Sequence, residues 1–369
     1  MYDIVLKNGK IIDHTQKLES KSDIAISRGR IKAIGSIAES SANKVVDLGN
    51  AYVTPGFVDI HTHVMENVTY LGVSPDIQLH EGVTTVIDAG SLGPGNYASS
   101  RTLINNARST VYTFVNLGFA GIAFFMPNGQ TPDIPFKQSV DVNLLKSVIE
   151  QNPEIRGIKV RPGKFSSGEL GIWDIETAVS VSSELGLRTV SHVGNPPPDI
   201  DGILNALGSD SVLTHAFRGG RNSLIDYVDK AKKLQRNGMI IDIGHGNAGF
   251  SFESAKYLMD NGLIPDTLSS DIHIRSIIGP CKGLVETMNK FIALDMDLTD
   301  IIAKVTAKPR DIFDLDEGTL FPGSKADIAV FTLEKKSRPL EDTEGNTVIS
   351  TEIISPKFTL KKGVFVQAR

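Results

Sequence analysis

Histidine and aspartate residues recur at the ends of apolar runs through the middle of this sequence. His61 and His63 close the run TPGFVDIHTH, and on a β-strand this spacing directs both imidazoles to one side. His192, His215 and Asp271 lie in the later runs LRTVSHVG, SVLTHAF and TLSSDIHI. Imidazole nitrogen and carboxylate oxygen are ligands of catalytic zinc, and they also suit manganese, iron or nickel. We therefore predict a metal site, and the surplus of ligands over what one open zinc ion needs points to two divalent ions.

Strand-like and helix-like segments alternate around these residues. Eight strand-like runs over about 260 residues, separated for the most part by helical stretches, are the pattern of a (β/α)8 TIM barrel, an α/β fold. The runs are FVDIHTH, TTVIDAG, TVYTFVNLG, IRGIKVR, LRTVSHVG, SVLTHAF, GMIIDIGHG and TLSSDIHI. We expect the barrel to occupy residues 54–315, with its functional side chains at the C-terminal ends of the strands.

Both ends of the chain have a sequence pattern that differs from that of the middle. Residues 1–53 contain short strand-like pieces broken by Asn-Gly and Arg-Gly turn signals, and residues 316–369 repeat this pattern. An N-terminal meander alone would leave its edges open. We therefore predict that 1–53 and 316–369 together form one small β-sandwich domain.

Composition limits the classes of partner. The net charge of −5 comes with no basic block, which argues against nucleic acid. The N-terminus lacks the features of a signal peptide, and no apolar run approaches the roughly 20 residues that span a bilayer. The single cysteine, Cys281, fits a reducing compartment. We expect a cytoplasmic protein that acts on a small molecule, with no membrane partner. Its oligomeric state stays open, with a homo-oligomer as one alternative.

The motifs resemble those of the amidohydrolase superfamily over essentially the whole chain. PGFVDIHTH is similar to its first-strand signature, IKV carries its bridging lysine, and HVG, LTH and SSD match its later ligand strands. GVTTVIDAGS, KVRPG, SHVGNPPP, LTHAFRGG, DIGHG and SSDIHIRSIIGP resemble the deacetylase or dihydroorotase-like branch, some of whose members are labelled adenine deaminase.

This resemblance implies a role for each candidate ligand. His61, His63 and Asp271 would bind the more buried ion, and His192 and His215 would bind the second ion. The resemblance also implies that Asp271 acts as the acid and base of the reaction.

Lys159, in the run IRGIKVR, would bridge the two ions after its amine is carboxylated by carbon dioxide. An ammonium group would repel the cations, whereas a carbamate supplies two oxygens and a negative charge. The amine must be neutral to react, and burial favours the neutral form. The alternative is an ordinary ion pair.

Three further residues are candidates for contact with the substrate. Arg161 follows Lys159 by two residues and could bind a substrate carboxylate, or it could form a structural ion pair. His245 could hold the substrate, orient a water or cap the next helix. His273 is expected to line the pocket rather than bind metal.

Three functions remain open at this point. The first is a binuclear hydrolase that cleaves a carboxamide or carboxylic ester, in an N-acyl or O-acyl compound or a cyclic amide, through metal-activated hydroxide. The second is a mononuclear deaminase of an adenine-type heterocycle, although SHVGNPPP lacks the glutamate of the usual HxxE pattern. The third is a non-catalytic assembly relative, which the full set of competent ligand positions disfavours.

Overall fold

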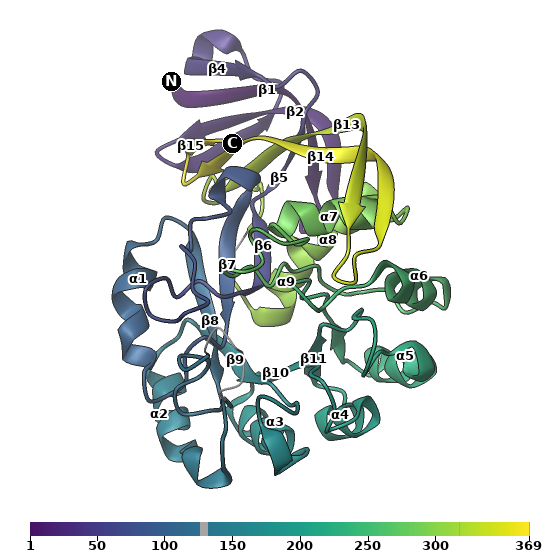
Figure 1. Ribbon diagram of the computed structural model, residues 1–369. Helices are drawn as coiled ribbons and strands as arrows, with labels where there is room; N and C mark the ends of the chain where they lie inside the picture. The colour runs from purple at the N-terminus through teal and green to yellow at the C-terminus, as the bar shows by residue number, and fades with distance from the viewer. Residues whose placement is uncertain (126–131, 317, 369) are drawn as a thin grey trace.

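The structure is a computed structural model that describes residues 1–125, 132–316 and 318–368. Figure 1 shows a β layer that holds both chain termini above a larger ring of strands and helices. The β layer is one eight-stranded sheet in the order β15-β14-β13-β5-β1-β2-β3, with β4 paired to β1. Its strands are β1 (Tyr2–Asp13), β2 (Leu18–Ser27), β3 (Arg30–Gly35), β4 (Ala42–Asp47), β5 (Tyr52–Pro55), β13 (Ile328–Glu341), β14 (Thr347–Lys361) and β15 (Val364–Gln367).

Strand β5 joins the two halves of this sheet. Val53 pairs in parallel with Ile11 of β1 and antiparallel with Val330 of β13. The two ends of the chain therefore form one sheet, as the turn-rich termini predicted.

The middle of the chain forms the barrel. Seven strands pair in parallel in chain order: β6 (Phe57–Thr62), β7 (Val83–Ala89), β8 (Thr110–Asn116), β9 (Ile155–Val160), β10 (Arg188–His192), β11 (Ser211–Thr214) and β12 (Ile240–Ile241). The helices are α1 (Arg101–Asn106), α2 (Val142–Gln151), α3 (Trp173–Leu185), α4 (Ile200–Leu207), α5 (Val228–Arg236), α6 (Phe252–Asp260), α7 (Leu284–Ile292), α8 (Leu298–Lys304) and α9 (Ala307–Phe313). Together with the terminal sheet, this is the predicted TIM-barrel fold.

The eighth predicted strand differs from the expectation. TLSSDIHI forms no regular strand, but single bridges pair Thr267 with Asp242 and Ile272 with Thr62, and these close the ring. Side chains replace part of the ladder, since Asp59 of β6 accepts hydrogen bonds from the backbone N–H and the hydroxyl of Ser270. A regular strand also cannot pass through Asp271, whose φ of 48° is left-handed.

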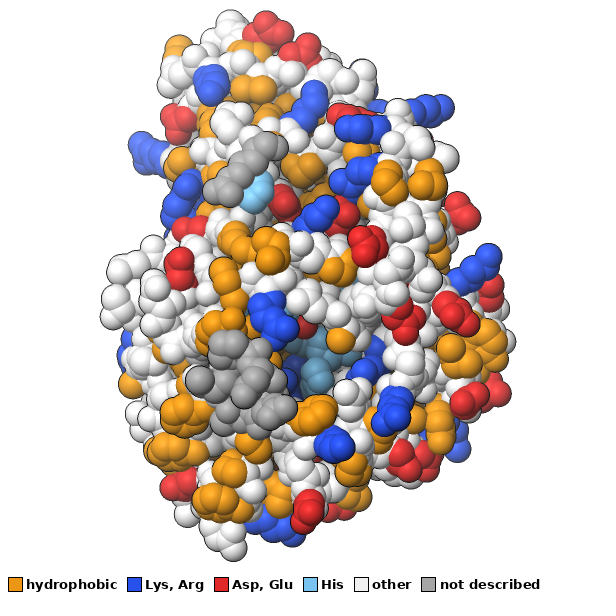
Figure 2. Space-filling model, in the orientation of Figure 1, with side chains coloured by type: hydrophobic (Ala, Val, Ile, Leu, Met, Phe, Trp, Pro, Cys, Tyr) orange, Lys and Arg blue, Asp and Glu red, His pale blue; other side chains and the backbone are white. Residues whose placement is uncertain are grey.

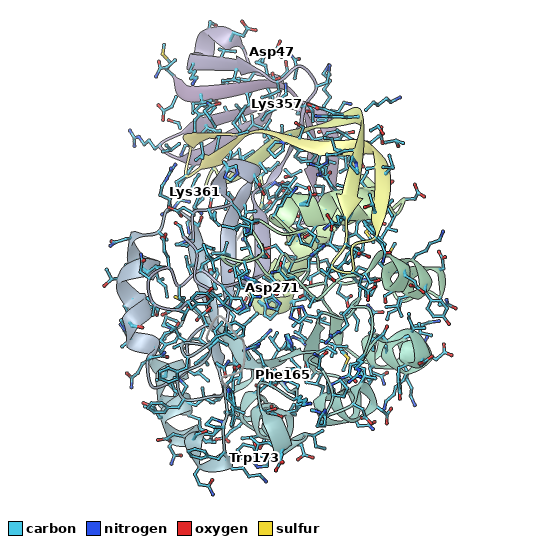
Figure 3. All side chains as sticks on the ribbon, in the orientation of Figure 1. Asp47, Phe165, Trp173, Asp271, Lys357 and Lys361 are labelled. Atoms are coloured by element: carbon cyan, nitrogen blue, oxygen red, sulfur yellow. The ribbon has the colours of Figure 1, made fainter. Side chains whose placement is uncertain are left out.

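A buried lysine attaches the terminal sheet to the barrel. Lys361 of β14, labelled in Figure 3, donates hydrogen bonds to the carbonyl of Thr84 (3.0 Å) and the hydroxyl of Thr110 (2.9 Å), and it pairs with Asp327 (2.6 Å). A buried ammonium is tolerated only where its donors are satisfied in this way. In the described part of the chain, no helix has the length and apolar character needed to cross a membrane.

Candidate metal centre

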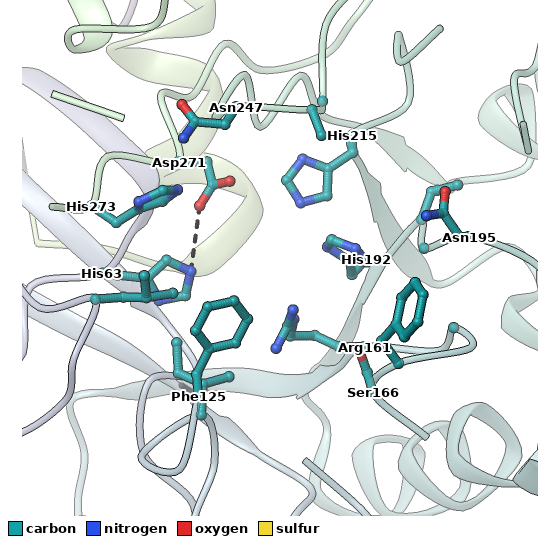
Figure 4. Close-up of a pocket in the computed structure, with 18 of the residues that line it drawn as sticks. His63, Phe125, Arg161, Ser166, His192, Asn195, His215, Asn247, Asp271 and His273 are labelled. Atoms are coloured by element: carbon teal, nitrogen blue, oxygen red, sulfur yellow. Dashed lines mark ion pairs between the residues drawn. The ribbon is translucent and has the colours of Figure 1, made fainter. Parts of the chain in front are cut away.

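Two histidines and an aspartate converge at the open end of the barrel. One ligand atom each from His61, His63 and Asp271 lie within 4.8 Å of one another. The Nε2 atoms of the two histidines are 3.5 Å and 3.3 Å from Asp271 Oδ1, and Figure 4 marks the second of these pairs. His215 and His192 lie beside this group, with ring centroids 4.4 Å apart, and the ring of His215 is 4.9 Å from that of His61. The predicted ligands thus share one site.

A hydroxyl relay fixes the tautomer of His61. Thr214 Oγ1 donates to Asp242 Oδ2 over 2.7 Å, so it accepts a hydrogen bond from His61 Nδ1 over 2.8 Å. The proton of the neutral imidazole is therefore on Nδ1, and the lone pair on Nε2 faces the site. Such outer partners orient metal-binding histidines and raise their basicity.

A second relay orients His63, and a backbone carbonyl orients His215. Ser91 Oγ donates to Asp88 Oδ2 and accepts from His63 Nδ1, both over 2.8 Å. His215 Nδ1 donates to the carbonyl of Gly244 over 2.5 Å. Each imidazole therefore presents Nε2 to the site, which is the form that a metal ion requires.

The backbone around two of the ligands is unusual. His215, just after β11, and Asp271 both have positive φ, 61° and 48°, which places each residue in the left-handed region. Such conformations cluster at functional sites. Gly244 and Gly246 leave space for the ligands, since a Cβ would lie 2.9 Å from His215 Nδ1 at the first and 2.1 Å from Asp271 Oδ2 at the second.

Lys159, in strand β9, lies beside His61. Its side chain is fully buried and its Nζ is 3.4 Å from His61 Nε2. No acidic side chain among the described residues lies within ion-pair distance of this nitrogen. Burial lowers the pKa of Lys159 from 10.5 to about 7. A substantial fraction of its amine is thus neutral near pH 7, as carboxylation requires.

The electrostatics of the site favour a cation. Burial lowers the pKa of His61 and of His192 well below 6.5, and that of His215 to about 3, so the imidazoles are neutral. Although burial acts to raise the pKa of Asp271, this pKa lies well below 3.8, so the carboxylate is ionised. Neutral imidazoles around an ionised carboxylate fit the donor set of a divalent ion.

The ligands open into a cavity of about 290 Å³, visible in Figure 2 as a hollow with pale blue histidines at its base. Asp271 is the only acidic residue of its described lining, whereas four side chains besides Lys159 carry positive charge: Arg161, Lys164, Arg218 and Arg275. Phe125 and Phe165 add aromatic surface. The walls thus suit an anionic compound with an apolar part.

The three candidate substrate residues occupy different positions. Arg161 lines the cavity but also pairs with Asp133 over 2.9 Å and 3.1 Å, so its charge is largely neutralised. His273 lines the cavity beside His63, with ring centroids 6.2 Å apart. His245 is not part of the described lining, because it is fully buried against Phe250.

Several residues of the site were not predicted from the sequence. Asp88, Ser91, Thr214 and Asp242 orient the histidines, and Arg218 lines the cavity. The available signal was a polar residue inside or just after an otherwise apolar strand, as in TTVIDAGS and MIIDIG.

Comparisons with known proteins agree with this site. No protein-family model matches the chain. A protein named deacetylase from Agrobacterium fabrum is 31% identical over 93% of this chain and 86% of its own length. A deacetylase of Enterococcus faecalis is 32% identical over 98% of both chains. A crystal structure described as a dihydroorotase superposes with a TM-score of 0.93 at 30% identity, covering 100% of this chain and 98% of that one. Another, described as an adenine deaminase, superposes with a TM-score of 0.90 at 32% identity over 100% of both.

A barrel with histidines and an aspartate at its strand ends, and identity above 30% over nearly the whole length, define the class. The chain belongs to the amidohydrolase superfamily and is a metal-dependent hydrolase. Within that superfamily its relatives are those of the deacetylase and dihydroorotase-like branch, as the motifs indicated.

Proposed function

We propose that this protein hydrolyses a carboxamide or carboxylic ester in an N-acyl or O-acyl compound, or a cyclic amide. The observation that carries the proposal is the convergence of His61, His63 and Asp271 beside the buried Lys159. The more buried ion would be held by these two histidines and the aspartate, and the second ion by His192 and His215. The bridge would be the Lys159 carbamate. Zinc is the first choice, with manganese, iron or nickel as alternatives.

Two divalent ions at this site would acidify water and polarise the carbonyl of the substrate. The protein supplies the proton transfers. Asp271 Oδ1 faces the space between the histidines, so this carboxylate accepts the proton of the attacking water and returns it to the leaving nitrogen or oxygen. The imidazoles could not deliver that proton, because their Nε2 atoms would hold the metal.

The positively charged side chains that line the cavity favour a substrate that bears a negative charge, such as a carboxylate. Arg218 is the strongest candidate anchor, because its hydrogen-bond partners, the Val193 carbonyl and Asn195 Oδ1 (3.1 Å), are neutral. Arg161, in contrast, already faces a carboxylate. Arg218→Met should raise KM for an acetylated amino acid about tenfold or more, since a charge-assisted hydrogen bond is lost. Arg221→Met, at an exposed position three residues away, is the control.

The primary test is metal content per chain in the parent and in Lys159→Ala. Near two ions in the parent and a loss in the variant support the binuclear site. One ion, unaffected by the substitution, favours the second candidate, a mononuclear amino-heterocycle deaminase. That candidate is kept because of the structural neighbour described as an adenine deaminase.

A further inference from the structure

A long hairpin of the terminal sheet reaches the catalytic face of the barrel. Strands β13 and β14 pair from Ile328↔Leu360 to Glu341↔Thr347, and Figure 1 shows this yellow hairpin running past α7 toward α6. Residues 342–346 form its tip. Asp342 in the tip is only 1% exposed, which is unusual for an aspartate in a hairpin turn.

The buried carboxylate of Asp342 caps a helix of the barrel. Its Oδ2 accepts a hydrogen bond from the backbone N–H of Phe252, the first residue of α6, over 2.9 Å. The residue that should cap α6, Ser251, makes no capping hydrogen bond, and its hydroxyl is buried without a partner. Asp342, from the terminal sheet, therefore caps the N-terminus of α6 in place of its own N-cap residue.

The tip also holds Phe250, which lies two residues before α6. Thr343 donates its N–H (3.2 Å) and its hydroxyl (2.6 Å) to the carbonyl of Phe250. The ring of Phe250 stacks on His245 with centroids 5.0 Å apart, and His245 Nε2 accepts from the buried Lys290 over 2.5 Å. The loop 244–251 is thus held by Thr343 of the tip on one side and by Lys290 of α7 on the other.

This loop is a wall of the metal centre. Its Gly244 carbonyl accepts from His215 Nδ1, its Gly246 leaves room for Asp271, and Asn247 lines the cavity. Glu344 of the tip lies against Gly219, where a Cβ would be 2.2 Å from Oε1. The tip therefore touches the loops that follow both β11 and β12.

We infer that the hairpin tip, residues 342–346, is a positioning device for the metal centre, and that Asp342 holds the 244–251 loop on which His215 depends. The part of this inference that concerns metal binding rests on the proposed function. The loop geometry does not. Asp342 acts through Phe252 and the loop, and it touches no reacting atom.

The test compares Asp342→Ala with Asp199→Ala. Asp199 is the ordinary N-cap of α4, accepting from Gly202 over 2.8 Å, and it supplies no contact to the loop. Loss of a cap should speed hydrogen exchange of the 244–252 amides about tenfold in Asp342→Ala and leave them unchanged in Asp199→Ala. Zinc affinity should fall about tenfold in the first variant only. Asp342→Asn, which keeps one acceptor oxygen, should recover part of both effects.

Two further measurements keep the outcomes distinct. If Asp342→Ala does not fold, Thr343→Val removes only the hydroxyl bond to Phe250 and should give a smaller rise in exchange of the same amides. Unchanged exchange in 244–252, or an equal rise in Asp199→Ala, overturns the inference. A parent that binds no metal contradicts the proposed function, whereas the exchange result still decides the role of the tip.

Discussion

Replacing Thr214 with valine should weaken metal binding without unfolding the protein. The substitution keeps the shape of the side chain but removes the hydroxyl that joins His61 Nδ1 (2.8 Å) to Asp242 Oδ2 (2.7 Å). All three side chains are buried, so no water replaces the lost oxygen readily. The donor on His61 is then unsatisfied, and the ring is free to turn its Nε2 away from the ion.

The magnitude follows from these contacts. Removing an outer partner of a metal-binding histidine typically lowers metal affinity about 10–100-fold, or about 1.4–2.7 kcal/mol. Stability of the metal-free protein should fall by about 1–3 kcal/mol for the orphaned buried donor. Asp242 keeps its bonds from Thr267 (2.7 Å) and Ser269 (2.8 Å), so the barrel should remain closed.

The assay is zinc competition against a chromophoric chelator, with urea unfolding of the metal-free protein in parallel. Thr267→Val is the matched control, since it removes an equivalent hydroxyl bond to Asp242 Oδ1 but does not contact His61. We expect a similar loss of stability in both variants and a loss of affinity in Thr214→Val alone. Equal affinities in the two variants would refute the idea that the relay orients His61.

Three other predictions concern the same site. Because burial lowers the pKa of Lys159 to about 7, its amine is about one-tenth neutral at pH 6 and about nine-tenths at pH 8. At fixed dissolved ¹³C-labelled carbon dioxide, the carbamate signal in NMR of metal-free protein should rise over this range, and a flat response would contradict the neutral-amine argument. Asp271→Asn should keep the fold but lower kcat about 100-fold or more, because the amide cannot take the proton from water; steady-state rates on an acylated amino acid measure this, and full activity would exclude the role. Gly246→Ala should lose metal, because its Cβ would meet Asp271 Oδ2 at 2.1 Å, whereas Gly208→Ala, also at positive φ but with open space around it, should only lose about 1 kcal/mol in urea unfolding.

The site could be predicted from the sequence where residues capable of metal binding fell at regular positions of a predicted strand. His61 and His63 could be placed together because strand period and residue spacing are both two, and the other ligands because parallel strands end at one face. The barrel and the joined terminal sheet followed from alternation and turn signals.

Contacts between distant segments could not be read in this way. The Thr214 relay depends on where Asp242 lies in space, and the Asp133 partner of Arg161 comes from a loop with no periodic pattern. His245 is adjacent in sequence to the site but points into the core, because Phe250 and Lys290 enclose it. The eighth strand was overpredicted because apolar alternation does not reveal a left-handed backbone.

Strand β5 sets a constraint on the order of folding. Val53 pairs with Val330, so this ladder joins residues that are separated in the sequence by the whole barrel. Closing so large a loop costs entropy before any contact repays it, and such non-local pairing slows folding. Until β13 emerges during synthesis, one edge of β5 has no strand partner and is open to pairing with other chains. We therefore expect nascent or C-terminally truncated chains to be the aggregation-prone species of this protein.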